Sequence, residues 1–172
     1  MKSVISFDVG IKNLAYCIMD NDLITKWDVV DIGGKTLDDV SDNLIQLLDD
    51  MMLTNDFQEL TVLIENQPVM KNPTMKSIQM IIYSYFRILH VHREYTIDVH
   101  HVSAMRKNKY MTTKGYDIKK KDYKSNKLNS ILCVQDWLKN KSFEQWETHL
   151  QARKKKDDLC DCLIQIISYF DM

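Results

Sequence analysis

Residues 3–32 read SVISFDVGIKNLAYCIMDNDLITKWDVVDI, and this stretch predicts a β-sheet at the start of the chain. Its apolar residues alternate with polar ones or bunch into short runs, as they do in strands buried on one or both faces. Gly10 to Asn13 separates the first run from the second, and Asn21-Asp22 is typical of a tight turn. We therefore expect three consecutive strands, at about 3–9, 14–20 and 23–31.

The rest of the chain mixes helices with two more strands. Apolar spacing predicts helices at 36–53, 74–92, about 124–139 and 156–170, and short apolar runs predict strands at 60–65 and 96–102. Residues 103–122 are polar and basic, so we expect a mobile loop there, and residues 140–155 give no clear pattern. The order βββαβαβ followed by helices indicates an α/β protein with a mixed sheet and helices packed on it. No repeat or boundary divides residues 1–172, which predicts a single domain.

Composition excludes several classes of protein. The hydrophobic share of 45% and charged share of 27% are ordinary for a globular protein, and no apolar run is long enough to cross a membrane. The N-terminus leads directly into a strand, without the pattern of a signal or transit peptide. The four cysteines form no C-x-x-C pair and have no histidine at zinc-ligand spacing. We expect reduced core thiols in an intracellular compartment, and no membrane partner.

The charges are unevenly distributed although the net charge is only −1. Residues 1–65 hold 4 Lys/Arg and 13 Asp/Glu, whereas residues 66–127 hold 13 Lys/Arg and 4 Asp/Glu. Residues 106–127 alone carry nine basic residues and three tyrosines. Such a segment is either a solvated loop or a nucleic-acid contact, because lysines attract phosphate and tyrosines stack on bases. We expect DNA contacts there.

Four carboxylates occupy positions where an apolar residue or a turn residue would be ordinary. Asp8 closes the apolar run of the first strand, and Glu65 closes that of the fourth. Asp158 and Asp161 are three residues apart and so share one face of a helix that is otherwise apolar. Asp8 could instead bond the turn at Gly10, and acids at a helix start could serve as caps. If the two strands are neighbours and the helix docks beside them, the four acids converge and require cations. Such a set suits Mg²⁺ or Mn²⁺, and two ions can clamp a phosphodiester for attack by water.

Three blocks of the chain resemble a known family. Residues 6–18 (SFDVGIKNLAYCI), 62–86 (VLIENQPVMKNPTMKSIQMIIYSYF) and 154–170 (KKKDDLCDCLIQIISYF) are similar to the Holliday junction resolvases of poxviruses and related large DNA viruses. Those enzymes are kin to fungal mitochondrial resolvases and, more distantly, to bacterial RuvC. The resemblance implies an RNase H-like fold with a five-stranded mixed sheet flanked by helices. It also implies a homodimer that nicks four-way DNA junctions symmetrically with Mg²⁺, for which Mn²⁺ would substitute, and a viral protein acting in the host cytoplasm.

The resemblance implies roles for individual residues. Asp8, Glu65, Asp158 and Asp161 would bind metal, and Asp157 would cap or support the helix. A lysine ahead of the aspartate pair would stabilise charge on the phosphate; Lys127 matches best, with Lys124 as the alternative. Gln67 and Pro68 match the family or simply end the strand. The residues expected to bind DNA are Lys12, Asn13, Lys107, Lys109, Lys119, Lys120, Lys121 and Lys124.

Three other functions fit part of this pattern. The closest rival is a related nuclease that cuts flaps or RNA–DNA hybrids, because metal chemistry alone does not select the substrate. A non-catalytic DNA-binding protein on the same fold would not need all four acids. The D-x-G motif also opens sugar kinases and actin-like ATPases, but these need a second phosphate loop and are usually about twice as long as this chain.

Overall fold

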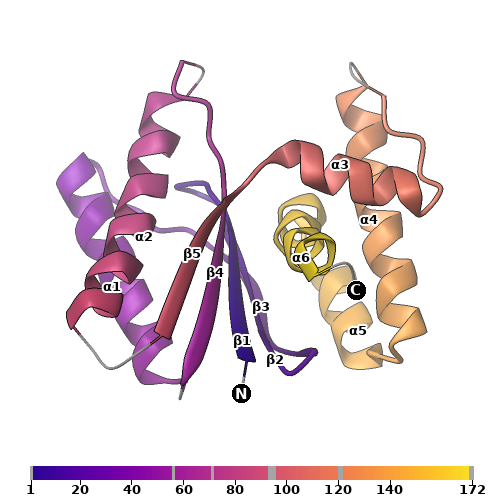
Figure 1. The fold of residues 1–172 in the computed structure, drawn as a ribbon. Helices are drawn as coiled ribbons and strands as arrows, with labels where there is room; N and C mark the ends of the chain where they lie inside the picture. Colours follow the sequence, from indigo (N-terminus) through magenta and orange to yellow (C-terminus); the bar gives the residue numbers. More distant parts are fainter. Residues whose placement is uncertain (1, 56, 71, 93–95, 120–121, 171–172) are drawn as a thin grey trace.

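The computed structural model describes residues 2–55, 57–70, 72–92, 96–119 and 122–170. Within these ranges, five strands form one sheet with the spatial order β3-β2-β1-β4-β5 (Figure 1). The strands are β1 (Lys2–Asp8), β2 (Leu14–Asp20), β3 (Leu23–Val30), β4 (Glu59–Glu65) and β5 (Thr96–Val102). The five predicted strands are confirmed, with ends that differ by a residue or so.

The sheet is mixed, and its pairing decides where the strand ends meet. β1, β2 and β3 form an antiparallel meander, whereas β4 and β5 run parallel to β1. Phe7 pairs with Ile64, so the residues that follow them, Asp8 and Glu65, end neighbouring strands at the same edge. Because parallel strands place their carboxyl ends together, this edge is where side chains from several strands can act jointly.

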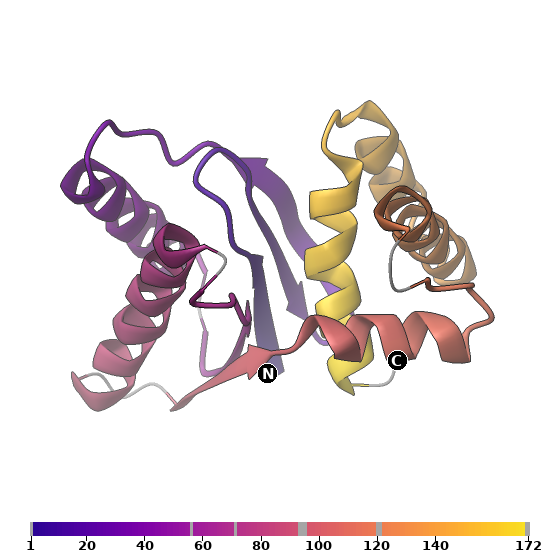
Figure 2. The ribbon, with the colours of Figure 1, turned by 90° about the horizontal axis from the view of Figure 1, so that it is seen from above.

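Helices cover both faces of the sheet. α1 (Leu37–Leu53) and α2 (Pro73–His92) lie on one face, as the two ribbon views agree (Figures 1 and 2). α3 (Ala104–Thr113), α4 (Tyr123–Asn140), α5 (Glu144–Ala152) and α6 (Lys156–Phe170) lie on the other. This three-layer arrangement gives each face of the sheet its own apolar core.

α6 is the central helix of the second core. It packs on β1 and β2 and is covered in turn by α3, α4 and α5. Every residue from Leu159 to Ser168 except Asp161 is therefore buried. Two long-range hydrogen bonds fix it on the sheet. The indole Nε1–H of Trp27 donates to the carbonyl of Leu159 at 2.9 Å, and the Gln165 amide donates to the carbonyl of Phe7 at 3.2 Å. The start of α6 is thereby held beside the carboxyl end of β1.

Local signals explain the first helix and correct one prediction. Thr36 and Asp39 form a capping box at the start of α1. Residues 104–113, which we predicted as part of a mobile loop, form α3. Ser103 caps this helix, and Tyr110 and Met111 pack into the core one turn after Lys107. The three basic residues of this segment, Arg106, Lys107 and Lys109, obscure its short apolar stripe in the sequence.

Residues 140–155, for which the sequence predicted no clear element, contain the helix α5, from Glu144 to Ala152. Cys17, Cys133, Cys160 and Cys162 are buried free thiols. No helix in the described ranges is long and apolar enough to span a bilayer.

Candidate active site

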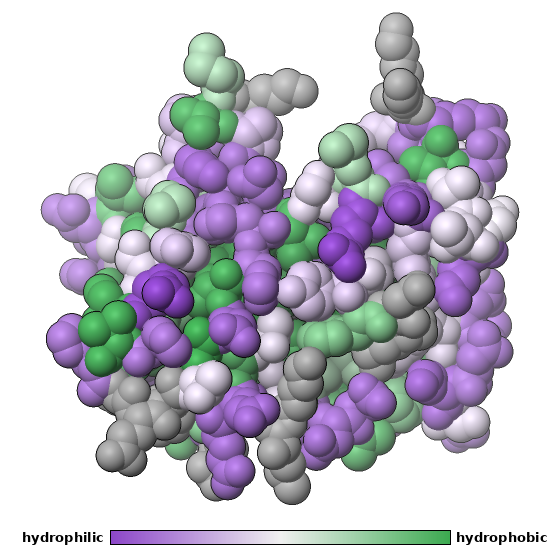
Figure 3. Space-filling model, viewed as in Figure 1, coloured by the Kyte–Doolittle hydropathy of each residue, from purple (hydrophilic) through white to green (hydrophobic). Residues whose placement is uncertain are grey.

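A polar cleft of about 290 Å³ opens at the C-terminal ends of strands β1 and β4. α3, α4 and the first turns of α6 form its other walls, and Figure 3 shows the surface notched at the upper edge, between the α2 side and the α3–α4 side. The lining includes all four predicted metal ligands together with Asp157, Lys107 and Lys127. The remaining lining residues are Ala104, Asn108, Met111, Tyr123, Asn126 and Ser130. The predicted convergence of acids from two strands and one helix is therefore seen in the structure.

Asp8 and Glu65 form a coupled pair of carboxyl groups at the floor of the cleft. Burial raises the pKa of Asp8 well above its ordinary value, and the neighbouring Glu65 carboxylate raises it further. Burial would also raise the pKa of Glu65, but Lys107 and hydrogen bonds from Asp8 and Gln67 hold it below its ordinary value. The same pocket therefore shifts the pKa values of the two acids in opposite directions. A cation bound beside them would favour the ionised form of both.

Lys107 lies among these acids. Its Nζ is 3.1 Å from Oε1 of Glu65 and 2.9 Å from Oδ2 of Asp161, and its side chain is only 6% exposed. Burial would lower the pKa of Lys107, but the carboxylates of Asp161, Glu65 and Asp8 raise it far above its ordinary value. The lysine is thus a permanent cation that compensates three acids. It was predicted as a DNA-binding residue and is instead buried inside the cleft.

The start of α6 supplies the second half of the acid cluster. Asp161 faces Lys107, while Asp157 forms an ion pair with Lys127 on α4. Burial raises the pKa of Asp158, and the adjacent Asp157 adds to this effect. Lys127 also lies 4.9 Å from the ring centre of Tyr123. Lys127 therefore lines the cleft, but its side chain is 39% exposed and contacts the supporting Asp157. Lys124, the alternative catalytic lysine, is not among the lining residues.

Gln67 has a positioning role that the sequence left open. Its Nε2 donates to Oε2 of Glu65 at 2.9 Å, and its own backbone N–H donates to Oε1 of Gln79 at 2.8 Å. Gln79 is buried in α2, and its side chain also contacts His101 at 2.6 Å. Gln79 and His101 thus hold Gln67 in position, and Gln67 holds Oε2 of Glu65. The other oxygen, Oε1, accepts from Lys107.

Apart from Lys107, the predicted DNA-binding residues that the structure describes are not among the residues that line the cleft. Lys12 is exposed in the turn after β1, with Asn13 beside it, and Lys109 and Lys124 are exposed on α3 and α4. Lys119 is exposed and pairs with Asp117 at 3.2 Å. Lys120 and Lys121 lie outside the described residues.

The donor set fits a hard divalent cation in chemistry, although the side chains are arranged around lysine. Carboxylate oxygens are the ligands that Mg²⁺ and Mn²⁺ prefer. In the described part of the chain, no three acidic, histidine or cysteine side chains meet around one point, because Glu65 and Asp161 turn to Lys107. Burial and the neighbouring Glu65 carboxylate both disfavour the ionised form of Asp8. A divalent cation held by these acids would offset both effects.

Comparison with known proteins gives a family match and a shared fold. The family described as Poxvirus A22 protein matches residues 2–171. An uncharacterized protein of Acanthamoeba polyphaga mimivirus, L451, is 37% identical over 139 residues, which cover 72% of this chain. This chain spans about a third of the length of that relative, since the match covers 32% of it.

Two solved structures share the fold over nearly the whole chain. The yeast mitochondrial Holliday junction resolvase Ydc2 superposes with a TM-score of 0.65 at 17% identity, covering 96% of this chain and 78% of that one. Thermus thermophilus RuvC in complex with a Holliday junction substrate gives a TM-score of 0.60 at 11% identity, covering 98% and 92%. The predicted RuvC-type, RNase H-like fold is confirmed by these likenesses.

Proposed function

The chain belongs to the Poxvirus A22 protein family, and from that membership we propose that it is a Holliday junction resolvase, an endonuclease that nicks four-way DNA junctions. The observation that carries this proposal is the cleft itself. Four carboxylates and a buried lysine line one cleft at the C-terminal ends of β1 and β4, on a fold shared with two junction resolvases. The resemblance noted in the sequence agrees with the family match.

Asp8, Glu65, Asp158 and Asp161 would hold the divalent metal, which we propose to be Mg²⁺ with Mn²⁺ as a substitute. The bound metal would supply an activated water and positive charge at the scissile phosphate. Gln67 keeps Glu65 oriented toward the cleft through its 2.9 Å hydrogen bond. Asp157 holds Lys127 at the rim by an ion pair.

We assign the charge-stabilising role to Lys107 in preference to Lys127. Lys107 contacts two of the proposed metal ligands directly and is almost fully buried, whereas the ion pair of Lys127 is with the supporting acid Asp157. An ammonium group at the floor of a closed cleft stabilises developing negative charge better than one in solvent, because water screens the latter. Lys127 and Lys124 are then DNA contacts at the rim.

The rest of the proposal concerns substrate grip. Lys12, Asn13, Lys109, Lys119, Lys120, Lys121 and Lys124 would contact the DNA backbone. We place the protein, as one domain, at the site of viral replication in the host cytoplasm, where its four buried thiols would stay reduced.

We also propose a homodimer that pairs through α2. Met80, Ile88 and Val91 are exposed and fall on one face of this helix, with Ser84 and Arg87 between them. An apolar stripe that the core does not use marks an association surface. A four-way junction presents two equivalent strands, so a two-fold dimer would bring one cleft to each.

A substrate panel tests the proposal. Purified protein with Mg²⁺ would be incubated with matched four-way junction, flap, linear duplex and RNA–DNA hybrid, and nicks would be mapped on each strand. We expect paired, symmetric nicks in the junction and at least tenfold slower cutting of the others. Faster cutting of flaps or hybrids would favour the related nuclease, and no cutting of any substrate would contradict an enzymatic role.

A further inference from the structure

A second pocket lies between α3 and α4, away from the acidic cleft. Its volume is about 520 Å³, within the range of small-molecule sites. The two helices divide their side chains between the sites: Lys107 and Met111 face the cleft, whereas Tyr110 and Lys114 line the pocket. On α4, the cleft is lined by residues up to Ser130 and the pocket by residues from Cys133 onward.

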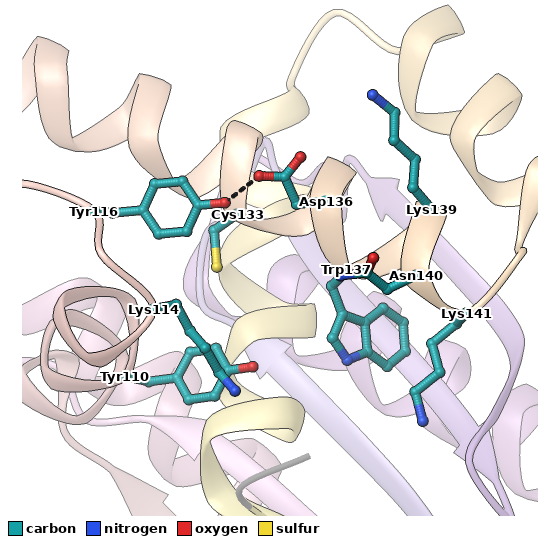
Figure 4. Close-up of a pocket in the computed structure, with 9 residues that line it drawn as sticks. All are labelled: Tyr110, Lys114, Tyr116, Cys133, Asp136, Trp137, Lys139, Asn140 and Lys141. Atoms are coloured by element: carbon teal, nitrogen blue, oxygen red, sulfur yellow. Dashed lines mark hydrogen bonds between the residues drawn. The ribbon is translucent and has the colours of Figure 1, made fainter.

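Aromatic rings form the walls of this α3–α4 pocket. Figure 4 shows the rings of Tyr110, Tyr116 and Trp137 around the cavity. The hydroxyl of Tyr116 donates to Oδ2 of Asp136 at 2.5 Å, which fixes that ring in place. The buried indole N–H of Trp137 has no acceptor among the described residues, and the ring packs against Phe143 with ring centres 5.7 Å apart. A hydrogen bond thus holds the Tyr116 wall in place, and packing holds the Trp137 wall.

The charge in the pocket is positive. Lys114, Lys139 and Lys141 lie around it, against the single carboxylate of Asp136. Lys114 Nζ is 5.1 Å from the ring centre of Tyr110, and Lys141 Nζ is 5.9 Å from that of Trp137. Burial raises the pKa of the Cys133 thiol to about 11, so this group stays neutral. The ammonium groups and the rings are thus within reach of one ligand.

Lysines at these positions also have a simpler explanation. α3 and α4 both end beside the pocket, and cations near helix C-termini offset the helix dipole. That explanation accounts for the charges but not for an aromatic cavity between the two ends. It also predicts a different result, since removing the lysines would then change stability and leave ligand binding untouched.

We propose that the α3–α4 pocket is a nucleotide-binding site, in which a nucleobase packs against the aromatic walls and its phosphate contacts the lysines. Base–aromatic stacking tolerates every base, and the amide of Asn140 offers a donor and an acceptor for a base edge. The nucleotide can be free, or it can be an unpaired residue of a DNA strand. Neither source requires the cleft to be active.

Isothermal titration calorimetry tests this site in buffer with EDTA, so that no cleavage occurs. The probes are adenosine 5′-monophosphate, inorganic phosphate and a five-nucleotide single-stranded DNA. The test variant is Lys114→Ala/Lys141→Ala. The control is Lys35→Ala/Lys154→Ala, which removes the same charge from two exposed lysines elsewhere. Melting temperatures of all proteins show whether the fold is kept.

We expect the monophosphate or the oligonucleotide to bind at one site, about tenfold tighter than inorganic phosphate. The test variant should lose about tenfold in affinity and the control less than twofold. Binding of the oligonucleotide alone would identify DNA as the source, and binding of both would identify the nucleotide unit. Equal losses in the two variants, equal affinity for inorganic phosphate, or no binding by either nucleotide probe would overturn the proposal. Because no metal or cleavage is involved, failure here leaves the resolvase proposal unaffected.

Discussion

Replacing Lys107 by methionine tests whether this lysine is the cation that holds the acidic cleft together. The change keeps most of the aliphatic volume and removes an ammonium group bonded to Glu65 at 3.1 Å and to Asp161 at 2.9 Å. Removing one partner of a buried ion pair costs about 3–5 kcal/mol, because the other charges stay buried without compensation. With a urea m-value of about 2 kcal/mol/M, the unfolding midpoint should fall by roughly 2 M.

Lys127→Met is the matched control. It removes the same charge from the same cleft, but Lys127 is 39% exposed and pairs with Asp157 near solvent. Exposed pairs contribute about 1 kcal/mol or less. In urea unfolding at pH 7 in EDTA, the midpoint of Lys107→Met should therefore lie well below that of Lys127→Met. A loss of less than about 1 kcal/mol in Lys107→Met would refute the reasoning.

The loss of unfolding free energy in Lys107→Met should also depend on pH and on added metal. The pKa of Lys107 is raised above its ordinary 10.5, so its contribution is fully present at pH 7. The pKa of Glu65 is lowered below its ordinary 4.5, so its contribution is present above pH 4.5 and is lost as the pH falls. The loss should shrink below pH 4.5. Added Mg²⁺ should stabilise Lys107→Met more than wild type, since a metal ion would then supply the missing charge.

Three further predictions address DNA binding, assembly and the first helix. Neutralising Lys119, Lys120 and Lys121 together should flatten the slope of log affinity against log salt by about 0.9 per lost phosphate contact; an unchanged slope in filter binding would make this segment a solvated surface. Ile88→Glu should convert the dimer to a monomer in analytical ultracentrifugation at micromolar concentration, whereas Leu53→Glu, at an exposed apolar position on α1, should not. Asp39→Asn should lower stability at neutral pH, because hydrogen bonds from Thr36 and Lys35 hold the pKa of Asp39 below its ordinary 3.8. The loss should shrink as the pH falls below 3.8, and equal urea midpoints at pH 7 would contradict this.

The two strand-end acids could be found from sequence because each violates a local rule. An acid that closes an apolar strand run is costly unless something compensates it, and Asp8 and Glu65 both occur in that position. Their adjacency follows once β1 and β4 are parallel neighbours. Asp158 and Asp161 could be predicted for a similar reason, since they share one face of a helix that is mostly apolar after its first turn.

Lys107 could not be recognised in the same way. It is one of nine basic residues between 106 and 127, and only its burial under α6 sets it apart. A weak signal was present: Tyr110 and Met111 follow at helical spacing, and Ser103 is a suitable cap. Reading that pattern as a helix would have placed one lysine on the apolar face. Gln79 is a comparable case, because the sequence does not show that this buried glutamine accepts a hydrogen bond from the backbone of Gln67.

Cleavage of a four-way junction by the Asp8→Asn variant tests the central claim most directly. Asp8 lies at the floor of the cleft, and its carboxylate would be needed to hold the divalent metal. At saturating DNA with Mg²⁺, we predict that the single-turnover cleavage rate falls roughly 100-fold or more, while junction affinity measured in Ca²⁺ stays within about threefold of wild type. A variant that nicks the junction at the wild-type rate would show that the chemistry occurs elsewhere.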